Sequence, residues 1–323
     1  MNLALLDRWI PFRLFSREGE PWVDWVHLED VRFTDPFFEQ TIRRCLQHPA
    51  NVLFRHQTPL TTLGDLYRQR PGLAPTGFIF HWSRCGSTLV SQMLASLEHA
   101  IVISEARPLD AVLRASAPAP ERVEWLRWMI NALAQPRHGE RHFFIKFDAW
   151  HVLQLPLIRR ALPEVPWIFL YRNPIEIMVS QQRQRGVHML PHALDPALFG
   201  LDPREAWMTR LDEYGAHVLA RMARAAVELH HSGRNRFLNF RELPEAVWES
   251  LLGFFEVECG ESDLAAIQRA AQFDAKRPAL DFECDVAAKQ IAATEELRAL
   301  TAQWVQPVYE ELERIRLQPK PKR

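Results

Sequence analysis

Short runs of apolar residues alternate along the chain with segments that are apolar on one helical face only. The runs lie at residues 77–82, 101–103, 142–147, 167–171 and 237–240. Unbroken apolar runs are typical of strands that are covered on both faces. After the first run the period changes, because Leu89, Met93 and Leu97 recur at helical spacing. The alternation predicts an α/β fold with a doubly wound parallel sheet of about five strands and helices on both faces.

Two proline-containing sequences mark helix starts in the second half of the chain. They are Asn-Pro-Ile-Glu at residues 173–176 and Asp-Pro-Arg-Glu at residues 202–205. A polar cap, a proline at the first helical position and a glutamate at the third favour helix initiation. The second start predicts one long helix that reaches about residue 231, and another helix is predicted from Pro244 to about residue 255.

The first 70 residues differ from the rest of the chain. Their aromatic-rich pieces predict a small β-containing extension that ends in a helix. No internal repeat and no low-complexity linker interrupts the remainder. We therefore divide the chain into an N-terminal extension, residues 1–70, and one α/β domain, residues 71–323.

Composition and charge narrow the classes of partner. The chain has 323 residues, is 47% hydrophobic and 24% charged, and carries a net charge of −1. This balance gives no overall basic field, so we expect neither a nucleic-acid nor a membrane partner. The four cysteines are far apart in sequence, which argues against structural zinc and for a reducing compartment. No apolar run is long enough for a membrane anchor, and we expect a cytoplasmic protein.

The turn after the first predicted strand has the composition of a phosphate loop. Gly86 tolerates backbone angles that other residues avoid, and the amides of residues 85–88 begin a helix, where unpaired N–H groups attract anions. Arg84 adds a cationic fork, and Ser87 and Thr88 add hydroxyl donors. An ordinary strand-to-helix turn with a capping hydroxyl explains these residues equally well.

Two better-known phosphate loops do not fit this turn. A nucleoside-triphosphate loop needs a lysine after its last glycine, and here Ser87 follows Gly86. A phosphatase loop built on Cys85 needs an arginine where the chain has Ser91. Cys85 itself is either a thiol of lowered pKa beside Arg84 or a small residue that fills a tight turn.

Polar residues also follow the other predicted strands. They lie in four loops: Arg84 to Thr88, Ser104 to Arg107, Lys146 to Asp148, and Arg172 with Ser180. Ligands of doubly wound sheets bind beyond the carboxyl ends of the strands. We therefore expect these four loops to form one site.

The loop sequences resemble those of sulfotransferases that use 3′-phosphoadenosine 5′-phosphosulfate (PAPS), in particular the carbohydrate and tyrosyl-protein branch. Residues 83–89, Ser-Arg-Cys-Gly-Ser-Thr-Leu, are similar to the first signature of that family. Residues 168–180 are similar to the second, a strand that ends in arginine and a helix with serine eight residues later. The resemblance covers about residues 77–315 and leaves the extension outside.

The resemblance implies a role for each loop. Arg84, Cys85, Gly86, Ser87 and Thr88 would bind the 5′-phosphosulfate of the donor. Arg172 and Ser180 would bind its 3′-phosphate.

The catalytic residues implied by the resemblance are Glu105, Lys146 and Arg84. Glu105, in a Glu-x-Arg sequence, would be the general base, and Lys146 would stabilise charge on the sulfuryl group and the leaving oxygen. Asp148 is the rival base, because cytosolic phenol and steroid sulfotransferases carry histidine at the comparable place. The implied function is sulfuryl transfer from PAPS, without a metal, to a hydroxyl or amine of a carbohydrate, lipid, peptide or small metabolite.

Departures from the family leave alternatives open. The late segment that clamps the 3′-phosphate in cytosolic enzymes is absent, and Lys276-Arg277 is one candidate substitute. Residues 181–192 form either an acceptor-side lid or a solvated connection, and Trp125, Trp128 and Trp150 line either an acceptor cleft or the core. A divergent kinase that uses ATP-Mg²⁺ and an inactive nucleotide- or partner-binding protein remain the alternative functions.

Overall fold

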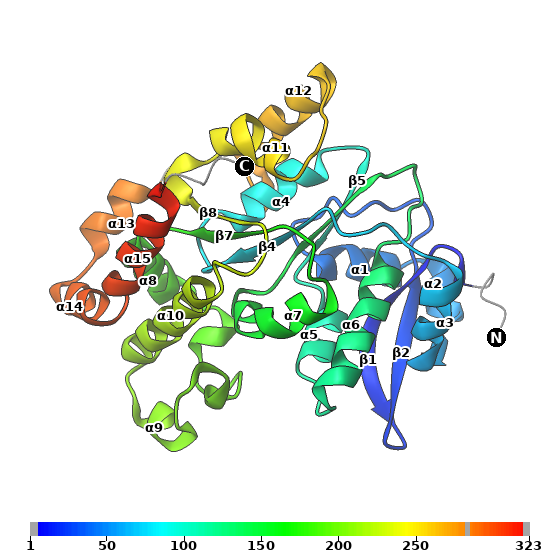
Figure 1. The fold of residues 1–323 in the computed structure, drawn as a ribbon, viewed down its shortest axis with the longest axis horizontal. Helices are drawn as coiled ribbons and strands as arrows, with labels where there is room; N and C mark the ends of the chain where they lie inside the picture. Colours follow the sequence, from blue (N-terminus) through cyan, green and yellow to red (C-terminus); the bar gives the residue numbers. More distant parts are fainter. Residues whose placement is uncertain (1–5, 282–284, 319–323) are drawn as a thin grey trace.

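The computed structural model describes residues 6–281 and 285–318. The described residues contain a five-stranded sheet in which all strands are parallel, in the order β5-β6-β4-β7-β8. Figure 1 shows this sheet at the centre of the molecule. Its strands are β4 (Gly77–His81), β5 (Ala100–Ser104), β6 (His142–Lys146), β7 (Trp167–Tyr171) and β8 (Asn235–Asn239). The predicted α/β class and parallel sheet are confirmed.

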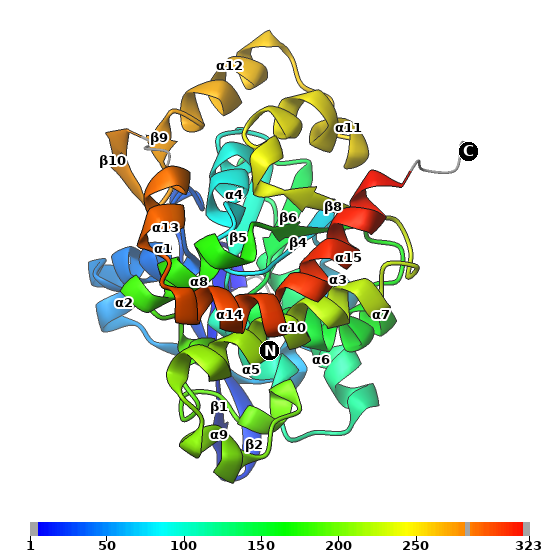
Figure 2. The same cartoon turned by 90° about the vertical axis from the view of Figure 1, so that its left-hand side faces the viewer.

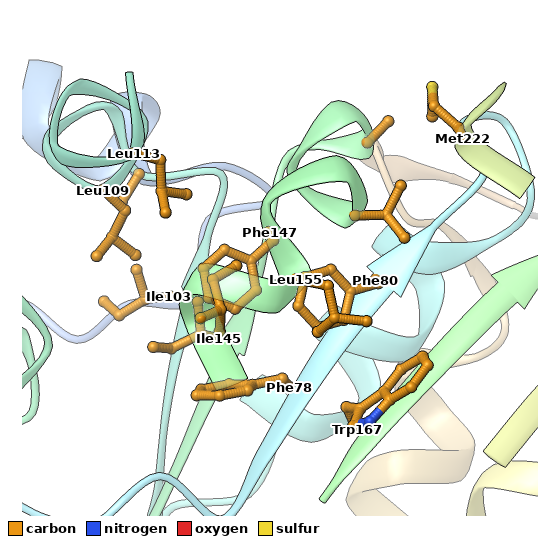
Figure 3. Close-up of a cluster of buried hydrophobic side chains, with 14 of the residues drawn as sticks. Phe78, Phe80, Ile103, Leu109, Leu113, Ile145, Phe147, Leu155, Trp167 and Met222 are labelled. Atoms are coloured by element: carbon orange, nitrogen blue, oxygen red, sulfur yellow. The ribbon is translucent and has the colours of Figure 1, made fainter. Parts of the chain in front are cut away.

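Alternate residues of each central strand face two separate hydrophobic clusters. In β4, Phe78 and Phe80 belong to the larger cluster and Ile79 to the smaller one. In β7, Phe169 and Ile168 divide in the same way. Figure 3 shows the larger cluster, in which Phe80 lies between Phe147 and Trp167. Burial on both faces explains why these strands read as unbroken apolar runs.

Helices cover both faces of the sheet. The larger cluster includes residues from α5 (Arg107–Leu113), α6 (Ala119–Leu133), α7 (Leu155–Ala161), α8 (Pro174–Arg183) and α10 (Leu211–Glu228). The smaller includes residues from α4 (Ser87–Ala95), a π-helical turn (Val247–Leu251), α11 (Leu252–Phe254) and α12 (Glu261–Ala270). Figure 2 shows α13 (Val286–Ala292), α14 (Glu295–Trp304) and α15 (Gln306–Leu317) along one side, where α13 and α14 pack against α8, and α14 and α15 against α10.

The N-terminal extension forms a small antiparallel sheet with helices. It comprises β1 (Trp9–Arg17), β2 (Glu20–His27), α1 (Phe38–Leu46), α2 (Pro49–Leu53), β3 (His56–Pro59) and α3 (Thr61–Gln69). In Figure 1 the β1–β2 hairpin, in blue, lies on the opposite side of the molecule from α13–α15. Val26 and Leu63 belong to the same buried cluster as Phe78. The extension therefore shares its core with the α/β part of the chain.

One predicted helix differs from the observed structure, and another contains an irregular turn. The predicted helix from residue 203 to 231 is interrupted, because α9 (Pro203–Met208) ends where Thr209 and Arg210 adopt extended angles, before α10 begins. Thr209 Oγ1 donates to the carbonyl of Glu205 and so caps the end of α9. The predicted helix from Pro244 to about residue 255 is present as one helical segment over residues 245–254, whose middle part, Val247–Leu251, is π-helical.

Several short elements complete the connections between strands and helices. They are 3₁₀ turns at Ala149–Gln154, Val187–Met189, Pro196–Phe199 and Phe240–Glu242, and a two-stranded pair, β9 (Phe273–Asp274) and β10 (Arg277–Asp281). The described residues include no helix that is long and apolar enough to cross a membrane.

The order of the sheet places two loops beside each other. The chain leaves β4 toward β5 on one side of the sheet and leaves β7 toward β8 on the other. Because β4 and β7 are neighbours, their exit loops diverge and leave a crevice at the carboxyl edge. The loops that contain Arg84 and Arg172 flank this crevice.

Candidate active site

A cavity of about 590 Å³ lies at the carboxyl edge of the sheet. Nearly all of the residues singled out from the sequence line it: Arg84, Cys85, Gly86, Ser87, Thr88, Glu105, Asp148, Arg172 and Ser180. The exception is Lys146, which is fully buried behind the wall and meets the cavity through Glu105. The structure thus brings the four loops together, as the sequence predicted.

The phosphate loop has an unusual backbone. Ser83, Arg84 and Gly86 have φ angles of 61°, 52° and 84°, in the left-handed region. Left-handed residues just ahead of a helix produce concave turns of backbone N–H groups that bind anions. A side chain at Gly86 would meet Leu243 Cδ1 at 2.8 Å and the Phe240 ring at 2.9 Å. Glycine is therefore required here by both its angles and its surroundings.

The start of α4 offers donors to the cavity. Ser87 and Thr88 are buried and lie in its wall. In the described part of the chain, no group accepts a hydrogen bond from either hydroxyl. The first amides of a helix also lack intrahelical partners, so this end of the cavity fits a phosphate or sulfate group.

Arg84 is held at the rim of the cavity. Its Nη2 donates to the carbonyl oxygen of Gln184 at 2.7 Å and to Oε1 of the same residue at 3.0 Å. Gln181 ties the same segment to the phosphate loop, because its Nε2 donates to Ser83 Oγ at 2.9 Å and its Oε1 accepts from Gly186 N. Residues 184–188 therefore form one wall of the cavity.

Glu105 and Lys146 form an ion pair between two strand ends. Lys146 Nζ lies 2.5 Å from Glu105 Oε1 and 4.8 Å from the centre of the Phe37 ring. Glu105 has a φ of 54°, a strained angle for a residue that is not glycine. Burial opposes ionisation of this carboxyl, but Lys146 and His81 outweigh burial and hold its pKa well below the usual range. Glu105 is thus an ionised carboxylate in the cavity.

His81 supports this pair as a neutral imidazole. Its Nδ1 accepts from the Ser83 amide at 3.1 Å, so Nε2 carries the proton and donates to the Phe147 carbonyl at 3.0 Å. Burial lowers the pKa of His81. Both ring nitrogens are therefore satisfied, which is typical of a structural histidine.

Asp148 is a second carboxyl in the cavity, with different electrostatics. Burial raises its pKa to about 7; His151 opposes this shift, while Glu105 and Asp110 add to it. His151 Nδ1 accepts from the Asp148 amide at 3.2 Å, and its Nε2 lies 2.9 Å from Asp110 Oδ1. Asp148 is therefore a carboxyl that changes protonation near neutral pH.

Arg172 also lines the cavity. Its Nε donates to Glu176 Oε2 at 2.5 Å and its Nη2 to Asp285 Oδ1 at 2.7 Å. The guanidinium carbon lies 4.0 Å from the centre of the Phe240 ring. Ser180, in α8, lines the same cavity. Arg84 and Arg172 therefore contribute two guanidinium groups to one cavity.

Cys85 fills the turn and is not an activated thiol. Its Sγ donates to the carbonyl of Leu170 at 3.2 Å, and burial raises its pKa to about 11. Of the two interpretations open from the sequence, the lowered pKa is wrong and the packed turn residue is confirmed.

Several residues of the cavity were not expected from the sequence. Phe37 and Lys289 gave no signal of their own, whereas Lys276, Trp150 and the segment that contains His188 were noted as candidates. His188 is neutral, since burial lowers its pKa to about 3, and burial lowers the pKa of Lys276 to about 8. The other two tryptophans considered, Trp125 and Trp128, pack against the hydrophobic core instead.

The donor set favours anion binding. The cavity is lined by arginine, lysine, hydroxyl and amide donors, together with the separate carboxylates described above. Within the described residues there is no group of three or more histidine, cysteine, aspartate or glutamate side chains arranged to hold a metal ion.

Comparisons with known proteins found similarity among solved structures only. No protein-family model matches the chain, and no curated protein matches it. A sulfotransferase from Mycobacterium avium is 14% identical, with a TM-score of 0.48 over 76% of this chain and 80% of the other. A sulfotransferase from Alicyclobacillus acidocaldarius is 16% identical, with a TM-score of 0.44 over 76% and 97%. Retinol dehydratase, solved with androsterone and the inactive cofactor PAP, is 12% identical, with a TM-score of 0.34 over 83% and 91%. The function of the cavity must therefore be argued from its own residues.

Proposed function

We propose that this protein transfers a sulfuryl group from PAPS to a hydroxyl or amine acceptor. The observation that carries the proposal is that Arg172 and the phosphate loop with Arg84 line one cavity, which has a carboxylate–lysine pair at its wall. The loop of Arg84 supplies one anion site and Arg172 with Ser180 the other. A nucleotide with phosphate groups at both its 5′ and 3′ positions matches this arrangement.

The residues at the phosphate loop would bind and neutralise the donor. The donor itself supplies a sulfuryl group on a phosphate leaving group. Amides at the start of α4, together with Ser87 and Thr88, bind its oxygens, and Arg84 balances their charge. Lys146 lies just behind Glu105 and stabilises the charge that develops on the departing phosphate. These cations do the work that magnesium does for kinases, so we propose no metal.

Glu105 is the proposed general base. In the ion pair with Lys146 it is a weak base, because the ammonium holds its pKa low. When Lys146 turns toward the leaving oxygen, Glu105 loses its main counter-ion, and burial then raises its pKa. The carboxylate becomes a stronger base at the moment when an acceptor proton must be removed.

Asp148 is the second candidate for the base. It lines the same cavity, and its pKa of about 7 suits proton transfer near neutral pH. The acceptor itself is proposed only as a hydroxyl or amine compound, whether carbohydrate, lipid, peptide or small metabolite.

Thermal unfolding with nucleotides tests the donor assignment. We expect adenosine 3′,5′-bisphosphate to raise the Tm more than adenosine 5′-monophosphate, and to do so without magnesium. At about 100 times its Kd the ligand contributes about 2.7 kcal/mol. Arg172→Ala should remove the advantage of the bisphosphate. A larger shift with ATP-Mg²⁺ would indicate a kinase, and no shift with any nucleotide would contradict both enzymes.

Donor breakdown tests the base. Release of adenosine 3′,5′-bisphosphate from PAPS should fall about 10²- to 10⁴-fold in Glu105→Gln. The Tm shift with bisphosphate should stay the same in that variant. Asp148→Asn is the matched control: a loss confined to this variant would assign the base to Asp148 instead.

A further inference from the structure

One carboxylate in the cavity wall lies between two cations. Asp285 Oδ1 lies 2.7 Å from Arg172 Nη2, and Asp285 Oδ2 lies 2.6 Å from Lys289 Nζ. All three residues line the cavity. The side chains of Arg172 and Lys289 are 5% and 6% exposed, whereas that of Asp285 is 45% exposed. Two buried cations thus share one carboxylate that is open to solvent.

The contacts of Asp285 with two cations suggest a role in donor binding, and this inference rests on the proposed function. We propose that Lys289 binds the 3′-phosphate of the donor together with Arg172, and that the Asp285 carboxylate takes the place of this phosphate while the donor is absent. Lys289 lies in α13, outside the sequences that resemble the family signatures.

The charges around Arg172 support an exchange of one anion for another. Glu176, which is buried, binds the other side of Arg172 at 2.5 Å and is tied in turn by Gln290 Nε2 at 3.0 Å. Glu176 is therefore a fixed partner, and Asp285 is the exposed one. If Asp285 left without a replacement, a buried positive charge would remain uncompensated, which is costly. A phosphate offers several oxygens to both cations and removes that cost.

The exchange needs no movement of a helix. Asp285 is the residue just before α13, and α13 is anchored to α8 independently, through the contact of Gln290 with Glu176. The Lys289 amide also donates to the Asp285 carbonyl at 3.0 Å, so the backbone stays in place when the side chain turns. The Phe240 ring beneath Arg172 keeps the guanidinium oriented. Rotation of one exposed side chain is therefore sufficient.

Calorimetric titration with two nucleotides tests the proposal. Asp285→Asn removes the competing charge, so adenosine 3′,5′-bisphosphate should bind about tenfold more tightly, the scale of a charged hydrogen bond. Lys289→Gln should weaken the same binding about tenfold. Adenosine 5′-monophosphate, which lacks the 3′-phosphate, should bind equally to the wild type and both variants.

Control measurements distinguish a failure of the proposed anion exchange from a failure of the proposed donor site. Glu228→Gln makes the same change in net charge away from the cavity and should leave both affinities unchanged. If the wild type binds the two nucleotides equally well, the proposed donor site itself fails. If the bisphosphate is preferred but Asp285→Asn does not tighten its binding, the exchange is overturned. Asp285→Ser replaces Asp285→Asn, with the same two outcomes, should the asparagine variant fold poorly.

Discussion

Glu105 and Lys146 are tied to each other twice. Their side chains meet at 2.5 Å, and the Glu105 amide donates to the Lys146 carbonyl at 2.8 Å. The backbone bond continues the ladder between β5 and β6, in which Ser104 pairs with Lys146. The sheet itself therefore sets the geometry of the pair, even though Glu105 lies just beyond the end of its strand.

Breaking the pair from one side should be costly. Lys146→Met leaves the Glu105 carboxylate without its main partner, and we expect a loss of about 3–5 kcal/mol in the free energy of unfolding. The double variant Lys146→Met/Glu105→Gln should recover part of that loss, because the uncompensated charge is gone. Urea denaturation of both variants and of Glu105→Gln gives the coupling energy. Additive losses would show that the two residues do not interact.

A second prediction follows from the backbone φ angle of Gly86 and from the side chains around it. Gly86→Ala should destabilise the protein by about 3 kcal/mol, from the left-handed angle together with the contacts of the new methyl group. It should also abolish the Tm shift with adenosine 3′,5′-bisphosphate.

Gly139→Ala is the control for Gly86→Ala. Gly139 has a φ of 78°, and nothing lies within 4 Å of an added Cβ. Only the angle opposes this change, so the loss should be about 1 kcal/mol and the nucleotide response should remain. Equal losses in the two variants would contradict the packing described around Gly86.

Asp148 makes stability depend on pH. Its pKa of about 7 lies above that of an unfolded aspartate, so the folded state holds its proton more tightly. The resulting stabilisation is present at low pH and is lost as the pH rises from about 4 to about 7. Asparagine does not titrate, so the Asp148→Asn variant keeps this stabilisation. Its free energy of unfolding should therefore rise relative to that of the wild type over this range, by up to about 4 kcal/mol. Denaturation at several pH values measures the difference, and a constant difference would contradict the raised pKa.

Cys85 should be unreactive in the folded protein. Burial raises its pKa to about 11, and its Sγ is engaged by the Leu170 carbonyl. We expect iodoacetamide to leave Cys85 unmodified near neutral pH and to modify it after unfolding. Cys259 is only half-buried and should react before Cys85. Peptide mapping by mass spectrometry distinguishes the two, and rapid labelling of Cys85 would show that the turn opens.

The strands were the most predictable part of the fold. Phe78 to Phe80 and Trp167 to Tyr171 are buried on both faces of the sheet. Every position in these stretches is therefore apolar, and an unbroken apolar run predicts such a strand. The break between α9 and α10 was missed, because the residues around Thr209 contain neither proline nor glycine, and a side-chain cap ends the helix there.

The site was predictable where it follows strand ends. Arg84, Glu105, Asp148 and Arg172 stand directly after apolar runs, and parallel strands bring such positions to one edge. Phe37 and Lys289 follow no strand of the central sheet, and they reach the cavity through the packing of the extension and of α13. Sequence patterns report local periodicity, whereas tertiary packing placed these two side chains.

The distance in sequence between Phe37 and Lys289, which both line the cavity, has a consequence for the newly made protein. Phe37 directly precedes α1, whereas Lys289 lies in α13. No short stretch of the sequence therefore contains all the residues that line the cavity. A chain still emerging from the ribosome has the phosphate loop and Glu105 well before Lys289 appears. The lining of the cavity is therefore complete only after Lys289 has been added to the chain.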